Sequence, residues 1–205
     1  MKNLIFGLLA VSLLIGCGKT ADVVPEEVIP PTQEEQPITP HKVGDTYGGG
    51  IIIKIFDKDG QHGLIAAATD QSLDCPWGTF SLEEIKRPLV YEEDGLDSYT
   101  YTSMIIDFYP PNYTNIAAHH ARSYNGGGYS DWSLPSQHEL YYIYQQREIL
   151  KLKGKRYWSS VLLKEEPTKD PRPIILNVET GEFKDDHSYG HHEDNVVSVR
   201  AVRTY

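Results

Sequence analysis

The sequence has little cysteine, a deficit of positive charge, and no apolar run long enough to cross a membrane. Only two of its 205 residues are cysteine, which excludes a scaffold held by several disulfides. Lysine and arginine number 19 against 29 acidic residues, and because nucleic-acid backbones attract cations, we do not expect nucleic acid as a partner. The apolar share of 40% is enough for one packed core, so we expect one folded domain.

Residues 1–16 have the pattern of a bacterial lipoprotein signal peptide. A basic start precedes the apolar run from Leu4 to Ile15, which is too short to cross a bilayer core about 30 Å thick as a helix. The run ends in Leu14-Ile15-Gly16-Cys17, which resembles a lipobox. We therefore expect Cys17 to carry lipid and to anchor the protein to a membrane. An ordinary secreted protein with a cysteine near the end of its signal is the alternative.

Residues 17–40 form the expected tether. The segment from Gly18 to Pro40 contains five prolines and five carboxylates but no aromatic residue, so it cannot build a core. Proline-rich segments of this kind are extended and separate a domain from its anchor. The folded domain is therefore expected to comprise residues 41–205.

Within residues 41–205 the pattern predicts short strands, tight turns and a few short helices. The β-branched run at 51–56, the Asp-Gly turn that follows and the apolar run at 64–68 predict a β-hairpin. Ser136 and Glu139 have the spacing of a capping box at the start of a helix. This mixed order favours an α+β domain over a doubly wound parallel sheet. We also expect a helix at 116–124, a strand that includes Trp158, and strands at 174–178 and 196–202.

Several separate blocks of the domain occur in an order that points to one family. They are Gly44-Asp45, Gly49-Gly50-Ile51-Ile52, Gly63-Leu64-Ile65-Ala66-Ala67, Thr69-Asp70-Gln71-Ser72, Trp77-Gly78, the run 127–136 with Glu139-Leu140, Tyr157-Trp158-Ser159-Ser160 and the run 199–203. These blocks resemble the Lcl C-terminal domain family, named after the C-terminal domain of a Legionella collagen-like adhesin. The resemblance implies a loop-rich fold related to C-type lectins and to the formylglycine-generating enzyme. It also implies an association with glycosaminoglycan binding and with trimers, but it names no ligand.

Positive charge is concentrated in one stretch of this acidic domain. The cations are Arg147, Lys151, Lys153, Lys155 and Arg156, and Glu148 is the one acidic residue among them. Such a cluster favours binding of a sulfated or carboxylated polysaccharide. A solvated helix end, whose cations complement the helix dipole, is the alternative.

Tyrosine is unusually dense between residues 91 and 144, where ten of the 14 tyrosines lie. Exposed tyrosine rings are rigid and amphipathic, which suits contact with sugars or with a surface protein, and Tyr99 and Tyr101 are the candidates for such contact. The stretch Tyr91-Glu92-Glu93-Asp94 belongs to the same segment. Tyrosines that pack long loops over a small core are the alternative.

No catalytic residues can be assigned from the sequence. A nucleophile elbow and a phosphate-binding glycine loop are both missing. The oxidase chemistry implied by the formylglycine-generating enzymes depends on a cysteine pair, whereas the domain contains only Cys75. Because a reactive thiol needs a nearby base, we expect Cys75 to be buried and structural. Arg200 and Arg203 are expected to pair with carboxylates, and Trp132 and Trp158 to pack in the core.

The sequence predicts neither a metal site nor a cofactor. The acidic turn that begins at Asp57 has Ala68 at its twelfth position, where a calcium loop of the EF-hand type needs a carboxylate. A histidine-rich stretch contains adjacent residues that would point to opposite faces of a strand. Its members are His187, His191, His192, Glu193 and Asp194, and His119 with His120 adds further donors.

We therefore expect a lipoprotein of the bacterial outer membrane that faces either the periplasm or the cell surface. Its domain is expected to be a noncatalytic binding or adhesion module for a glycan or an envelope partner. Two other classes remain open, namely an enzyme or enzyme accessory that acts on cell-envelope polysaccharide, and a structural envelope protein.

Overall fold

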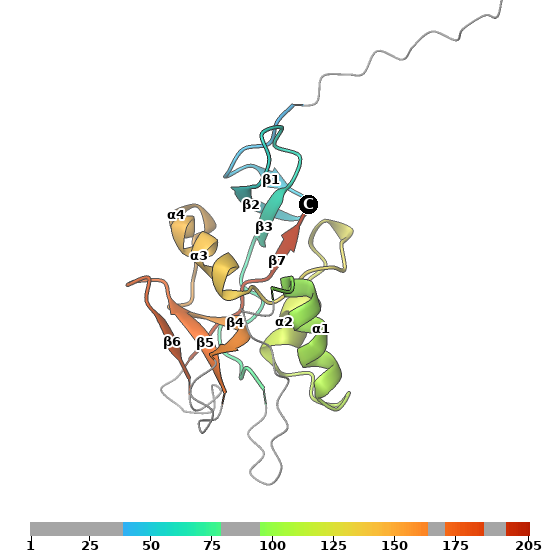
Figure 1. Cartoon of the computed structure of the whole chain (residues 1–205), viewed down its shortest axis with the longest axis vertical. Coiled ribbons are helices and arrows are strands. Elements are labelled where there is room, and N and C mark those ends of the chain that lie inside the picture. The colour runs from blue at the N-terminus through green and yellow to red at the C-terminus, as the bar shows by residue number, and fades with distance from the viewer. Residues whose placement is uncertain (1–38, 79–94, 164–170, 187–195) are drawn as a thin grey trace, which may run out of the picture. The chain divides into compact units, whose positions relative to one another are not determined.

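The computed structural model describes residues 39–78, 95–163, 171–186 and 196–205. Ile38–Tyr205 form one compact unit. The predicted signal peptide, Cys17 and nearly all of the tether lie outside the described residues. The described part contains short strands and short helices in mixed order, which confirms an α+β domain (Figure 1).

The first sheet has the strand order β1-β2-β3-β7, and each neighbouring pair is antiparallel. The strands are β1 (Thr46–Tyr47), β2 (Gly50–Ile55), β3 (Gly63–Ala67) and β7 (Val202–Thr204). The predicted hairpin is confirmed, because β2 pairs with β3 and Ile52 lies opposite Ile65. Asp57 stabilises the connecting turn, since its Oδ1 accepts a hydrogen bond from the Gln61 amide at 3.0 Å.

The second sheet is antiparallel in the order β4-β5-β6. Its strands are β4 (Arg156–Leu163), β5 (Arg172–Asn177) and β6 (Phe183–Asp185). The expected strands at 158 and at 174–178 are therefore confirmed. The strand expected at 196–202 is not formed as such, because only Val202–Thr204 joins a sheet. The preceding residues cross between the sheets and make isolated bridges from Ser198 to Tyr157 and from Val199 to Ser72.

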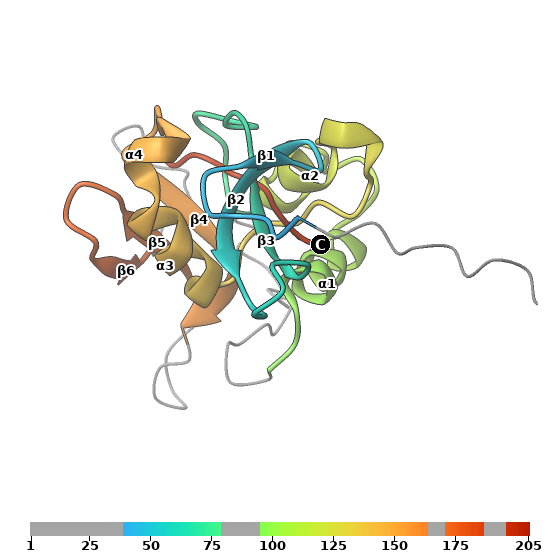
Figure 2. The ribbon, with the colours of Figure 1, turned by 90° about the horizontal axis from the view of Figure 1, so that it is seen from above.

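Four helices are described: α1 (Ser98–Phe108), α2 (Ala117–Arg122), α3 (Gln137–Gln145) and α4 (Arg147–Leu150). The capping box at Ser136 and Glu139 is confirmed at the start of α3. The helix expected at 116–124 is α2, and the 3-10 turn η2 (Gly126–Gly128) follows it. In both ribbon views, α1 and α2 lie on one side of the first sheet, and α3 and α4 lie on the other side with the second sheet (Figure 2).

Three tryptophans belong to the larger core cluster. Trp77, Trp132 and Trp158 are each fully buried. Their indole N–H groups donate to the backbone carbonyls of Ser159, Gly126 and Cys75 respectively, at 2.7, 3.1 and 2.8 Å. Burial of such a large ring is favourable when its one donor has a partner, so the predicted core role of Trp132 and Trp158 is confirmed.

Candidate functional site

The basic stretch lies along α4, the loop after it and the start of β4. Arg147 begins α4, Lys151 caps its end in a left-handed conformation, and Arg156 begins β4. A cleft of about 490 Å³ opens beside this stretch. Its lining contains two cations and two glutamates: Arg147, Glu148, Lys151, Leu152, Val178 and Glu179.

Part of this positive charge already has partners within the protein. The Arg147 guanidinium lies 4.5 Å from the centre of the Tyr144 ring and donates to the Tyr144 carbonyl at 3.0 Å. The Lys155 ammonium lies 3.2 Å from a carboxylate oxygen of Glu179. The cleft therefore has mixed charge, although in the sequence of residues 147–156 only Glu148 opposes the five cations.

A buried ion pair holds the loop that carries Lys153. The side chains of Asp70 and Arg200 are 2% and 1% exposed, and Arg200 Nε lies 2.7 Å from Asp70 Oδ1. The Lys153 amide donates to the other oxygen of Asp70 at 3.1 Å, and the Tyr157 hydroxyl donates to Oδ1 at 3.0 Å. Burial, with a smaller effect of the Asp70 carboxylate, raises the pKa of Tyr157, so the phenol stays protonated and donates. The expected pairing of Arg200 with a carboxylate is confirmed.

A second cleft, which we name the Tyr99 cleft, has a volume of about 290 Å³. It is lined by the start of α1, the segment before α3 and β7, namely by Asp97, Ser98, Tyr99, Asp131, Ser133, Arg203 and Thr204. Tyr99 is 48% exposed, and the Arg122 guanidinium lies 4.0 Å from the centre of its ring. Arg122 also donates to the carbonyls of Trp132 and Tyr99 at 2.9 and 3.0 Å, so the cation beneath the ring is fixed.

A second arginine, which lines the Tyr99 cleft, is also held by a polar partner and an aromatic ring. Arg203 Nε donates to Asp131 Oδ1 at 2.6 Å, which confirms its expected pairing with a carboxylate, and its guanidinium lies 3.6 Å from the centre of the Tyr129 ring. Asp97 caps α1 by accepting from the Thr100 amide at 2.7 Å. The cleft thus presents aromatic, cationic and anionic groups whose positions are set by internal contacts before any ligand arrives.

Tyr101 belongs to the core and not to the surface. It is 1% exposed and packs within the larger core cluster, while its hydroxyl accepts from the Leu96 amide at 3.1 Å. Residues two apart on a helix point in different directions, so α1 exposes Tyr99 and buries Tyr101. Tyr101 is therefore no longer a candidate for ligand contact.

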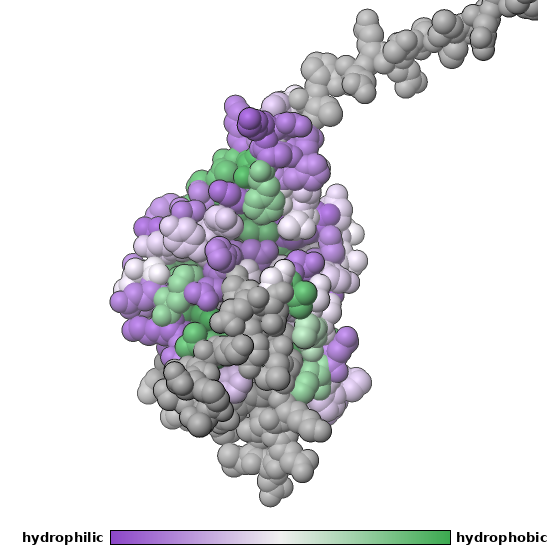
Figure 3. All heavy atoms as spheres, in the orientation of Figure 1, coloured by the Kyte–Doolittle hydropathy of each residue, from purple (hydrophilic) through white to green (hydrophobic). Residues whose placement is uncertain are grey.

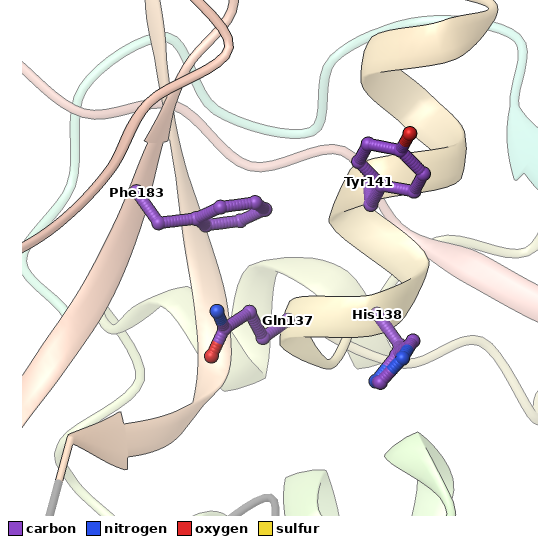
Figure 4. Close-up of a pocket in the computed structure, with 4 residues that line it drawn as sticks. All are labelled: Gln137, His138, Tyr141 and Phe183. Atoms are coloured by element: carbon purple, nitrogen blue, oxygen red, sulfur yellow. The ribbon is translucent and has the colours of Figure 1, made fainter.

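A third cleft of about 270 Å³ lies between α3 and β6 (Figure 4). It is lined by Gln137, His138, Tyr141 and Phe183. The sequence did not indicate this cleft, because Phe183 is far from the α3 residues along the chain and only the tertiary fold brings them together.

The described residues also settle the expected burial of Cys75. This thiol is 3% exposed, which confirms the expected burial, and burial raises its pKa to about 12. Within the described ranges there is no group of three or more histidine, cysteine or acidic side chains arranged to hold a metal. Residues 91–94 and the stretch His187 to Asp194 lie outside the described part.

No described helix is long and apolar enough to span a bilayer. The described residues form an α+β domain with surface clefts. No family model matches the chain, and no curated protein matches it either.

Proposed function

We propose that residues 41–205 are a noncatalytic, lectin-like module that binds a glycan of the cell envelope or a partner carrying one. The lipid on Cys17 would hold it at the outer membrane, on the periplasmic or the outer side, and the family resemblance favours a trimer. The observation that carries this proposal is the Tyr99 cleft, where an exposed aromatic ring, two carboxylates and a guanidinium converge.

The chemistry of the Tyr99 cleft suits a sugar. The exposed Tyr99 ring, at 48% exposure, offers an apolar surface for the C–H groups of a pyranose ring, and a tyrosine hydroxyl can donate or accept a hydrogen bond. Charged acceptors such as Asp97 and Asp131 form strong hydrogen bonds with hydroxyl donors. The volume of about 290 Å³ is at the lower end of small-molecule sites, which suits a single sugar ring.

The carboxylates of this cleft already accept hydrogen bonds within the protein. Asp97 accepts from the Thr100 amide, and Asp131 accepts from Arg203. A binding role requires only such acceptors, whereas glycoside hydrolysis would need one carboxyl group to deliver a proton to the leaving oxygen.

Surface character agrees with a ligand that is polar overall. On the face shown in Figure 3, apolar atoms form several separate groups among polar side chains. This face therefore offers polar groups to a hydrophilic ligand.

The basic stretch supplies a second candidate site, for an anionic polysaccharide. The cleft of about 490 Å³ beside Arg147 and Lys151 is the larger of the two sites, which favours it. Glu148 and Glu179 in its lining oppose it, because they repel an anionic ligand.

A glycan array with the purified protein tests both sites. Tyr99→Ala should abolish or strongly weaken binding, whereas Tyr113→Ala, which removes another exposed tyrosine outside the cleft, should not. Binding at the Tyr99 cleft should depend little on salt, whereas binding at the basic stretch should weaken as the Debye length falls to about 8 Å. If Lys151→Gln with Lys153→Gln removes binding and Tyr99→Ala does not, the basic stretch is the site. An array with no bound glycan would contradict the proposed function.

A further inference from the structure

The cleft between α3 and β6 places two aromatic rings and two polar groups around one space. Tyr141, which is 46% exposed, comes from α3, and Phe183 comes from β6. Figure 4 shows the Phe183 ring across the opening from Tyr141, with the Gln137 amide and the His138 imidazole on the first turn of α3. Phe183 packs against both core clusters, so its ring is held in place.

The first turn of α3 connects this cleft to the Tyr99 cleft. Gln137 and His138 line the cleft between α3 and β6. The next residue, Glu139, accepts a hydrogen bond at 3.1 Å from the hydroxyl of Ser98, and Ser98 lines the Tyr99 cleft. The capping box between Ser136 and Glu139 fixes this turn. Successive residues of a helix point about 100° apart, so one capped turn can serve two neighbouring clefts.

The sizes of the two clefts bear on the length of a ligand. Their volumes are about 270 and 290 Å³, and small-molecule sites generally begin near 300 Å³. Each cleft therefore suits about one sugar ring. A ligand that fills both must contain several rings.

We propose that the cleft of Figure 4 is a second sugar subsite and that the ligand is an oligosaccharide of N-acetylated amino sugars spanning both clefts over the first turn of α3. This inference rests on the proposed function. The Gln137 carboxamide has donors and acceptors that match those of an acetamido group. Phe183 and Tyr141 supply apolar faces for the acetamido methyl group and for the sugar ring.

Titration calorimetry on the full chain tests the inference with β-1,4-linked N-acetylglucosamine oligomers, from the monosaccharide to the hexasaccharide. We expect the longer oligomers to bind at least about tenfold more tightly than the monosaccharide, because they occupy two subsites. The hexasaccharide of unsubstituted β-1,4-linked glucose is the control for the acetamido group, and it should bind about tenfold more weakly.

Variants in each cleft separate this inference from the proposed function. Phe183→Leu keeps apolar packing but removes the flat ring, so it should reduce affinity for the long oligomers about tenfold. Tyr99→Ala should weaken binding of every oligomer. An unchanged melting temperature of Phe183→Leu shows that the loss is local.

Three results would overturn the inference. If Tyr99→Ala loses binding but neither Phe183→Leu nor oligomer length matters, the second subsite is refuted while the proposed function stands. If the glucose hexasaccharide binds as tightly as its acetylated counterpart, the assigned sugar class is refuted. If no oligomer binds, this inference fails, and the array result decides whether the proposed function fails with it.

Discussion

The Cys75 thiol is held in a state that should be chemically inert in the folded protein. It is 3% exposed, and burial raises its pKa to about 12. Only the thiolate reacts with alkylating agents, and a free cysteine has a pKa of about 8.5. We predict that iodoacetamide labels Cys75 at pH 8 about 1,000-fold more slowly in buffer than in denaturant, as measured by mass spectrometry. Comparable rates would show that the residue is accessible.

Asp70 and Arg200 form a pair whose loss should be costly. Removing one partner of a buried pair leaves the other charge uncompensated, which typically costs about 3–5 kcal/mol. We predict a loss of this size in the free energy of unfolding for Asp70→Asn, measured by urea denaturation. Lys155→Gln is the matched control, because Lys155 and Glu179 are 75% and 58% exposed and such pairs contribute at most about 1 kcal/mol. Equal effects of the two substitutions would contradict the buried network.

At the scale of elements, the turn between β1 and β2 packs directly on η2. A Cβ atom built on Gly49 would lie 2.0 Å from the Gly126 carbonyl carbon, and Gly49 has a φ of +87°. Gly128 has a similar φ of +78° but open space around its Cβ position. An alanine at Gly128 would therefore cause backbone strain alone, whereas an alanine at Gly49 would cause both backbone strain and a steric clash.

We predict that Gly128→Ala destabilises the domain by about 1–2 kcal/mol, the cost of the left-handed conformation, and that Gly49→Ala costs clearly more. Thermal unfolding by calorimetry gives the comparison. If both variants melt at the same temperature, the close approach of the two loops is not maintained in solution.

The capping box of α3 gives a further test at this scale. Ser136 Oγ accepts from the Glu139 amide, and Glu139 Oε2 accepts from the Ser136 amide at 2.8 Å. Ser136→Ala should cost about 1 kcal/mol of unfolding free energy. Ser130→Ala, at an exposed position outside the helix, should change the stability by less than about 0.5 kcal/mol. If Ser136→Ala leaves the free energy of unfolding unchanged, the cap does not stabilise α3.

For the whole molecule, the proposed lipid anchor and the folded domain should be separable. Ile38–Tyr205 form one compact unit, so a chain that begins at His41 should show a single cooperative melting transition close to that of the full protein. Loss of that transition on removing residues 18–40 would place the domain boundary elsewhere.

Cys17→Ser should release the protein from the membrane fraction, and mass spectrometry should find lipid only on the unsubstituted chain.

Elements whose contacts are local were predictable from the sequence. The hairpin of β2 and β3 depends on β-branched residues around a short Asp-Gly turn, and the start of α3 depends on two side chains three residues apart. α1 was missed, because its buried positions Ser98, Tyr101, Thr102 and Ile105 have helical spacing but include two small hydroxyl residues that hide the apolar pattern.

The candidate site depends on contacts that no local pattern contains. Arg200 and Asp70 are 130 residues apart, and the Tyr99 cleft combines segments at 97–99, 131–133 and 203–204. The sequence by itself determined the mixed fold class, the burial of Cys75 and the pairing of the two arginines with carboxylates, because residue type and nearby spacing govern these features. Only the tertiary structure decided which carboxylates pair with these arginines, and that Tyr99 is exposed while Tyr101 is buried. The reason is that these contacts form only when segments distant in the sequence pack against one another.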